Sequence, residues 1–175
     1  MEVTKKTSLN RETETCRWLG LDPGLAKLGW AVLDEDGDRA PILVDYGTIS
    51  TARSRPTAER LMELEQDLTA LLEEFRPTHI AVEMPFFSRQ IKAAGAVLQA
   101  VGIVNLVCYR QAGIIPCFLH QSSWKAHLGN GRADKAEVAA MVQVLFNLEQ
   151  LPIDDSADAI AIGYAGLCGL TNNIN

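Results

Sequence analysis

The sequence predicts a single α/β domain: a mixed five-stranded sheet, three strands antiparallel and two parallel, flanked by helices on both faces. Three observations carry this prediction. Three short apolar runs near the N-terminus are separated by turn residues. The rest of the chain alternates helical patterns with short apolar runs typical of strands. The 175 residues are enough for one domain with a full hydrophobic core.

The first three strands are predicted at residues 17–21, 29–33 and 42–50. Pro23-Gly24 separates the first two runs, and Asp36-Gly37 separates the last two. Because such pairs favour tight turns, we expect three antiparallel strands that follow one another in the chain.

The later elements alternate between helix and strand. Leucines and Phe75 recur at intervals of three and four over residues 57–75, which predicts a helix that Pro77 ends. Residues 79–83 are an apolar run closed by a carboxylate, which predicts a strand. The remaining predicted elements are a helix over about 88–112, a strand over 114–119, and helices over 135–148 and 155–167.

The composition and the apolar runs indicate the compartment in which the protein is expected. The longest apolar runs, such as 103–107 and 159–162, fall far short of the ~20 residues of a membrane-spanning helix, so no membrane is expected as a partner. Residues 1–16 lack the apolar core of a signal peptide, and we expect them to form a disordered arm. The domain would occupy residues 17–170, with a tail at 171–175. A cytoplasmic location with reduced cysteines is expected.

Four carboxylates stand out by their positions. Asp22 and Glu83 each end an apolar run, and on neighbouring parallel strands they would repel unless a divalent cation neutralised them. Asp155 and Asp158 are three residues apart and share one face of the last predicted helix. Each acid also has an ordinary alternative role, in a turn for the first two and in capping a helix for the last two.

Taken together, the four acids predict a metal site made only of oxygen ligands. Such ligands suit Mg²⁺ or Mn²⁺ rather than Zn²⁺. Two such ions about 3.5 to 4 Å apart can activate a water and stabilise the leaving oxygen of an in-line phosphoryl displacement. The predicted chemistry is that of a nuclease.

Four motifs, in this order, carry a family resemblance: GLDPG (20–24), HIAVE (79–83) with Phe86 shortly after it, GNGRADK (129–135) and DSADAIAI (155–162). They resemble the RuvC-type Holliday junction resolvases of the ribonuclease H-like superfamily, from about residue 17 to residue 167. The departures are Ser156, where the family more often has alanine, Met84, where it has a polar residue, and the arm before Arg17.

The resemblance implies a homodimer that nicks two opposed strands of a four-way DNA junction symmetrically. It implies two Mg²⁺ per subunit, with Mn²⁺ as a substitute, and a branch-migration helicase complex as a partner near the nucleoid. The catalytic and metal-binding residues would be Asp22, Glu83, Asp155 and Asp158, with Asp22 bridging the two ions.

The net charge of −6 opposes non-specific binding to DNA, because affinity for phosphates comes mainly from lysine and arginine. Bound Mg²⁺ would offset part of this charge, and a local group of cations would have to supply the rest. The predicted phosphate contacts are Arg89, Lys92, Lys125, Arg132 and Lys135. Phe86 is expected to stack on junction bases, with burial in the core as the alternative.

The small-residue helix over 88–112 allows close packing of a second helix, within the chain or across a dimer interface. Since two symmetric cuts call for two active sites, we expect it at or near the interface.

Three other functions stay open. The segment DPGLAKLG (22–29) also resembles the phosphate-binding hairpin of actin-like ATPases and sugar kinases, but 175 residues do not comfortably supply their two lobes. A non-catalytic DNA-binding module would have no reason to keep the four acids. A general ribonuclease H-like nuclease would share the metal chemistry and differ in its substrate.

Overall fold

A computed structural model describes residues 16–37, 40–85, 91–152 and 154–170, and of residues 91–94 and 154 it describes the backbone alone. The arm predicted for residues 1–15 and the tail at 171–175 lie outside this part. So do Phe86, Arg89 and the side chain of Lys92. Across the described ranges, no helix is long and apolar enough to cross a membrane.

The five strands form one sheet in the order β3-β2-β1-β4-β5. β1 (Arg17–Asp22) pairs antiparallel with β2 (Lys27–Asp34), which pairs antiparallel with β3 (Ile42–Ser50). On its other side β1 pairs parallel with β4 (His79–Glu83), and β4 pairs parallel with β5 (Cys117–Leu119). The predicted mixed sheet is confirmed, and β1 is its central strand.

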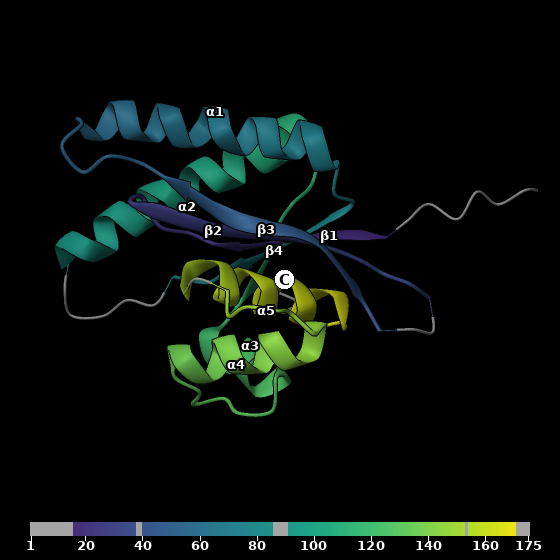
Figure 1. Ribbon diagram of the computed structural model, residues 1–175. Coiled ribbons are helices and arrows are strands. Elements are labelled where there is room, and N and C mark those ends of the chain that lie inside the picture. Colours follow the sequence, from purple (N-terminus) through teal and green to yellow (C-terminus); the bar gives the residue numbers. More distant parts are fainter. Residues whose placement is uncertain (1–15, 38–39, 86–90, 153, 171–175) are drawn as a thin grey trace, which may run out of the picture.

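Helices cover both faces of this sheet, as predicted (Figure 1). One face carries α1 (Thr57–Phe75) and α2 (Ile91–Ala112), which also pack on each other. The opposite face carries α5 (Asp154–Leu167), and α3 (Gln121–His127) and α4 (Lys135–Phe146) pack against α5. The alternation of side chains along β1 explains this arrangement, because Leu19 and Leu21 belong to the core under α1 and α2, whereas Trp18 belongs to the core around α5.

Several predicted elements differ from the observed ones. β5 begins at Cys117 rather than at residue 114, because Pro116 has no N–H for the ladder and the Ile114 N–H bonds the Cys108 carbonyl at the end of α2. The helix predicted over 135–148 ends at Phe146, since Asn147 takes a left-handed conformation with φ of 50°. α3 was not predicted, because seven residues are too few to show a helical period.

Two glycines let α5 lie directly on the sheet. A Cβ on Gly29 would overlap the carbonyl oxygen of Asp155 and lie 2.6 Å from its carbon. A Cβ on Gly20 would overlap the carbonyl oxygen of Ala159 and lie 2.7 Å from the Cα of Gly163. Backbone therefore packs on backbone, which brings the first turns of α5 to the adjoining ends of β1 and β2.

Candidate active site

Two acids meet at the carboxyl ends of the two central parallel strands. In the register of β1 and β4, Leu21 lies opposite Val82, so the next step along both strands places Asp22 beside Glu83. On the other side of β1, Asp22 pairs with Gly29 of β2. The sequence prediction that these two strand ends are neighbours is confirmed.

The first turns of α5 bring the other two acids to the same place. Asp155 is the residue whose backbone packs on Gly29, the partner of Asp22 in the sheet. Asp158 lies one helical turn further and is buried, with 6% of its surface exposed. The charges of Glu83, Asp155 and Asp158 therefore all act on Asp22 at this end of the sheet, and the charge of Asp158 also acts on Glu83.

The electrostatics of Asp22 reflect this crowding. Its pKa is raised from 3.8 to about 8, first by burial and then by the negative charges of Glu83, Asp158 and Asp155. The positive charge of Lys135 acts in the opposite direction. A partly buried carboxylate surrounded by acids favours a cation or a proton.

The pKa of Glu83 is also raised by burial and a neighbouring acid, but polar neighbours lower it in part. Its pKa is raised from 4.5 to about 7 by burial and by the charge of Asp158. The Trp124 indole N–H donates to Glu83 Oε2 at 3.1 Å, and the Gln121 amide donates to Oε1 at 3.4 Å. The Trp124 bond stabilises the charged form of Glu83 and lowers its pKa.

Lysines border the acids on two sides. Lys135, at the start of α4, has its Nζ 3.5 Å from Asp155 Oδ1, and Lys27 of β2 has its Nζ 3.9 Å from Asp155 Oδ2. Lys125 donates to the Ala133 carbonyl at 2.8 Å and lies 5.4 Å from the centre of the Trp124 ring. Its charge also lowers the pKa of Glu83, so two of the predicted cations, Lys125 and Lys135, lie beside the acids.

The remaining predicted DNA contacts are less closely tied to the acids. Arg132 is exposed on the loop before α4, where its backbone N–H donates to Asn130, and no ion pair within the described ranges involves it. Phe86, Arg89 and the side chain of Lys92 lie outside the described residues.

The four acids fit a hard divalent cation by their chemistry, because all their donor atoms are carboxylate oxygens and the raised pKa values show a deficit of positive charge. In the part of the chain that the structure describes, no three His, Cys, Asp or Glu side chains are already grouped so that they could hold an ion. Ion binding would therefore require the carboxylates to turn toward a common point.

Two supporting residues were missed at the sequence level. Trp124 was not singled out as a site residue; it is fully buried, and its indole N–H also orients Glu83. Lys27 was not singled out, although it follows Asp22 by five residues and returns to the same end of the sheet on β2. The β1–β2 turn supplies a signal for Lys27, whereas none in the sequence indicates the bond from Trp124.

A mixed sheet of this strand order, with acids at the adjoining ends of its central strands and on the helix that crosses them, defines a ribonuclease H-like domain. The family model for crossover junction endodeoxyribonuclease RuvC matches residues 18–165. The chain therefore belongs to the RuvC family of crossover junction endodeoxyribonucleases.

Individual relatives agree with this assignment. The RuvC of Synechocystis sp. is 66% identical over 158 residues, which cover 90% of this chain and 95% of that protein. The RuvC of Heliobacterium modesticaldum is 38% identical over 154 residues, covering 87% and 94%. Among solved structures, T. thermophilus RuvC in complex with a Holliday junction substrate has a TM-score of 0.76 and 32% identity, covering 85% of this chain and 91% of that one.

Proposed function

We propose that this protein is a metal-dependent endonuclease that resolves four-way DNA junctions by paired symmetric nicks. The observation that carries the proposal is the meeting of Asp22, Glu83, Asp155 and Asp158 at one end of the sheet, where burial and mutual repulsion raise the pKa of Asp22 to about 8. The similarity to a RuvC structure that contains a Holliday junction supports the choice of substrate.

The proposed cofactor is Mg²⁺, two ions per subunit, with Mn²⁺ as a substitute. A set of carboxylate oxygens without histidine or cysteine favours these hard cations. When bound, such ions lower the pKa of a water and stabilise the leaving oxygen of a phosphodiester. Asp22 would lie between the two ions, because β1 pairs with β4, which carries Glu83, and packs against α5, which carries Asp155 and Asp158.

The surrounding side chains have supporting roles in this proposal. Trp124 and Gln121 donate hydrogen bonds to the carboxylate of Glu83 and so restrict its orientation beside the other acids. Lys135 and Lys125 place positive charge where a phosphate would approach, and Arg132 extends this basic edge. Phe86, Arg89 and Lys92 complete the proposed DNA contacts from the sequence alone.

A homodimer is proposed because two symmetric nicks require two copies of the site. α2 offers a surface for this pairing. Leu98, Leu106 and Tyr109 of α2 are 42%, 54% and 64% exposed and lie on one side of the helix, opposite the face that packs in the core. A branch-migration helicase partner and a location at the nucleoid in the cytoplasm follow from the family resemblance only.

A cleavage assay tests the proposal. Purified protein with Mg²⁺ is given labelled four-way junctions, plain duplex and RNA–DNA hybrid. We expect paired, symmetric cuts in the junction that leave 5′-phosphate and 3′-hydroxyl ends. Asp22→Asn should bind the junction and leave it intact, whereas Asp67→Asn, which changes an exposed acid on α1, should cut like the wild type.

Each alternative function has its own outcome in this assay. Equal cutting of duplex and junction would indicate a general nuclease. Hydrolysis of ATP in the absence of DNA would indicate a relative of the actin-like ATPases. Junction binding without cleavage by the wild type would indicate a non-catalytic DNA-binding module.

A further inference from the structure

A basic cavity opens beside the candidate active site. It has a volume of about 800 Å³ and lies between the β1–β2 turn, the segment from β3 into α1, and α2. Asp155 is one of its lining residues, so the cavity is continuous with the acid cluster. Its cationic lining residues are Lys27, Arg53 and Arg60.

Arg60 is held in a fixed orientation within this cavity. Its Nε donates to Thr51 Oγ1 at 2.9 Å, and the Thr51 hydroxyl donates in turn to the Leu25 carbonyl of the β1–β2 turn. Thr51 is buried, with 6% of its surface exposed, so its bond to the Leu25 carbonyl is shielded from water, whereas its bond from Arg60 is part-buried. Within the described ranges, the Arg60 guanidinium makes this one hydrogen bond, through Nε, so its two terminal nitrogens can bind a ligand.

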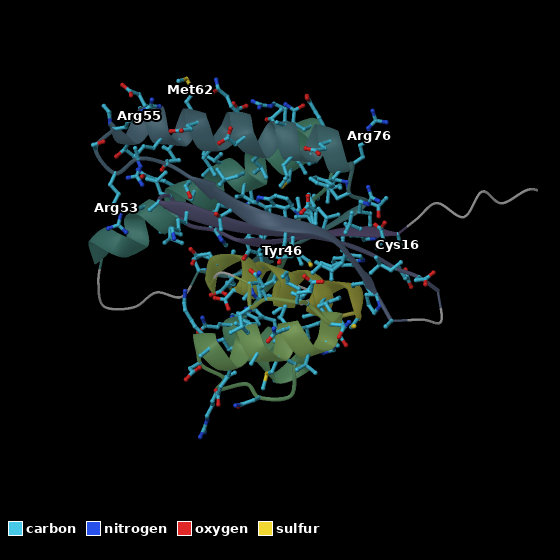
Figure 2. All side chains as sticks on the ribbon, in the orientation of Figure 1. Cys16, Tyr46, Arg53, Arg55, Met62 and Arg76 are labelled. Atoms are coloured by element: carbon cyan, nitrogen blue, oxygen red, sulfur yellow. The ribbon has the colours of Figure 1, made fainter. Side chains whose placement is uncertain are left out.

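The other two cations differ in how they are engaged. Arg53 is exposed, and Figure 2 shows it between the start of α1 and the first turns of α2, whereas Arg55 extends on the outer side of the loop. Among the described residues, neither Arg53 nor Arg60 is ion-paired with a carboxylate. The contact of Lys27 with Asp155 is long, at 3.9 Å, and a phosphate would compete for it.

We propose that this cavity binds a backbone phosphate of the DNA strand that is cut, next to the scissile phosphodiester; the inference rests on the proposed function. A guanidinium with both terminal nitrogens available matches two oxygens of one phosphate. The remaining lining residues are uncharged and add no further negative charge: Gly24, Leu25, Ala26, Ser50, Thr51, Ala96 and Val97. The occupied cavity sets the register of the strand over the four acids.

The first test measures junction binding in an Asp22→Asn background, so that no cleavage intervenes. Arg53→Gln and Arg60→Gln should each weaken binding about tenfold and lower the slope of log K against log salt by about one. Arg60→Lys should recover part of the loss, because it keeps the charge but not the paired donors. Arg55→Gln, which removes an exposed arginine paired with Glu63 outside the cavity, should match the parent.

The second test locates the phosphate. Junctions carry one neutral methylphosphonate at a time on either side of the cleavage site. A methylphosphonate at one of these positions should weaken junction binding by the parent protein. The same methylphosphonate should have little further effect on binding by Arg60→Gln and Arg53→Gln. Thermal unfolding of each variant separates lost binding from lost structure at Thr51, and Arg53→Gln, whose side chain is exposed, should unfold like the parent.

The outcomes distinguish the two proposals. If the wild type cuts junctions as expected while Arg53→Gln and Arg60→Gln bind like Arg55→Gln, the cavity does not hold a phosphate and the proposed function stands. If no single methylphosphonate loses its effect in the variants, the cavity proposal is also wrong. If the wild type neither binds nor cuts junctions, both proposals fail.

Discussion

At the scale of single residues, Asp22 combines burial with three like charges. Its pKa of about 8 means that the folded protein binds this proton more tightly than the unfolded chain, where the ordinary value is 3.8. The contribution of Asp22 to stability is therefore fully present below about pH 4 and is lost as the pH rises toward 8. At neutral pH the charge of Asp22 therefore lowers the stability of the metal-free protein and favours the binding of a cation.

Asp22→Asn should consequently stabilise the metal-free protein. We expect a higher melting temperature than wild type at pH 8, equivalent to on the order of a few kcal/mol. The difference should shrink as the pH falls toward 4. Thermal unfolding in EDTA over this pH range measures it, with Asp67→Asn as the control on an exposed acid.

The effect of added Mg²⁺ on the melting temperatures of the wild type and of Asp22→Asn is the complementary measurement. Added Mg²⁺ should raise the melting temperature of the wild type more than that of Asp22→Asn, since the ion offsets the repulsion that the substitution removes. A variant that is less stable than wild type at pH 8 without metal would contradict the electrostatic account of this site.

Trp124 is linked to the candidate active site by its hydrogen bond to Glu83. Trp124→Phe keeps an aromatic ring in the core and removes the 3.1 Å bond to Glu83 Oε2. We expect the Mg²⁺ concentration for half-maximal cleavage to rise by about tenfold, because residues that orient metal ligands have effects of this size. A saturating Mg²⁺ concentration should restore most of the rate.

Trp30→Phe is the matched control for that prediction. Trp30 is partly buried on β2, packs against Phe75 and belongs to the core on the opposite face of the sheet. It should alter stability without changing the Mg²⁺ dependence. An equal shift in both variants would mean that the effect of Trp124 is general packing rather than orientation of Glu83.

At the scale of secondary-structure elements, the position of α5 depends on glycines in the strands beneath it. Gly29→Ala should force the first turn of α5 away from the sheet, because the new Cβ would overlap the Asp155 carbonyl. We expect a loss of stability of about 1 to 3 kcal/mol. Cleavage should fall about a hundredfold, because Asp155 and Asp158 move with the helix.

Gly95→Ala is the control for this substitution. Gly95 lies in α2, and a Cβ there would meet nothing within 4 Å. Alanine in a helix should stabilise the protein by about 0.5 to 1 kcal/mol relative to glycine. Urea unfolding and the junction-cleavage rate, measured on both variants, would show whether close packing at Gly29 is what the active site requires.

At the scale of the whole molecule, the apolar side of α2 predicts the quaternary structure. Leu106→Glu places a charge on this side, and we expect it to produce monomers that keep their fold. Val144→Glu is the control, since Val144 is 82% exposed on α4, in the helical layer on the other face of the sheet. Light scattering coupled to size-exclusion chromatography should find Val144→Glu dimeric, and a dimeric Leu106→Glu would exclude this interface.

Much of the architecture and the acids could be predicted from sequence because they depend on local chemistry. Period-two and helical patterns located all five strands and four of the five helices, and carboxylates at the ends of two apolar runs identified Asp22 and Glu83. The spacing of Asp155 and Asp158 on one helical face completed the set. Chain order and side-chain type were sufficient for these features.

Only the tertiary structure decided the features that depend on distances between remote segments. The contact of Gly29 with α5, the bond from Trp124 to Glu83 and the cavity around Arg60 each join residues that are far apart in the chain. Neither polarity nor periodicity reports such contacts, since they arise from how closely two backbones approach after folding. The sequence by itself thus determined which acids are candidates for the chemistry, and the packing of α5 on the sheet and of α3 against α5 determined their geometry and electrostatics.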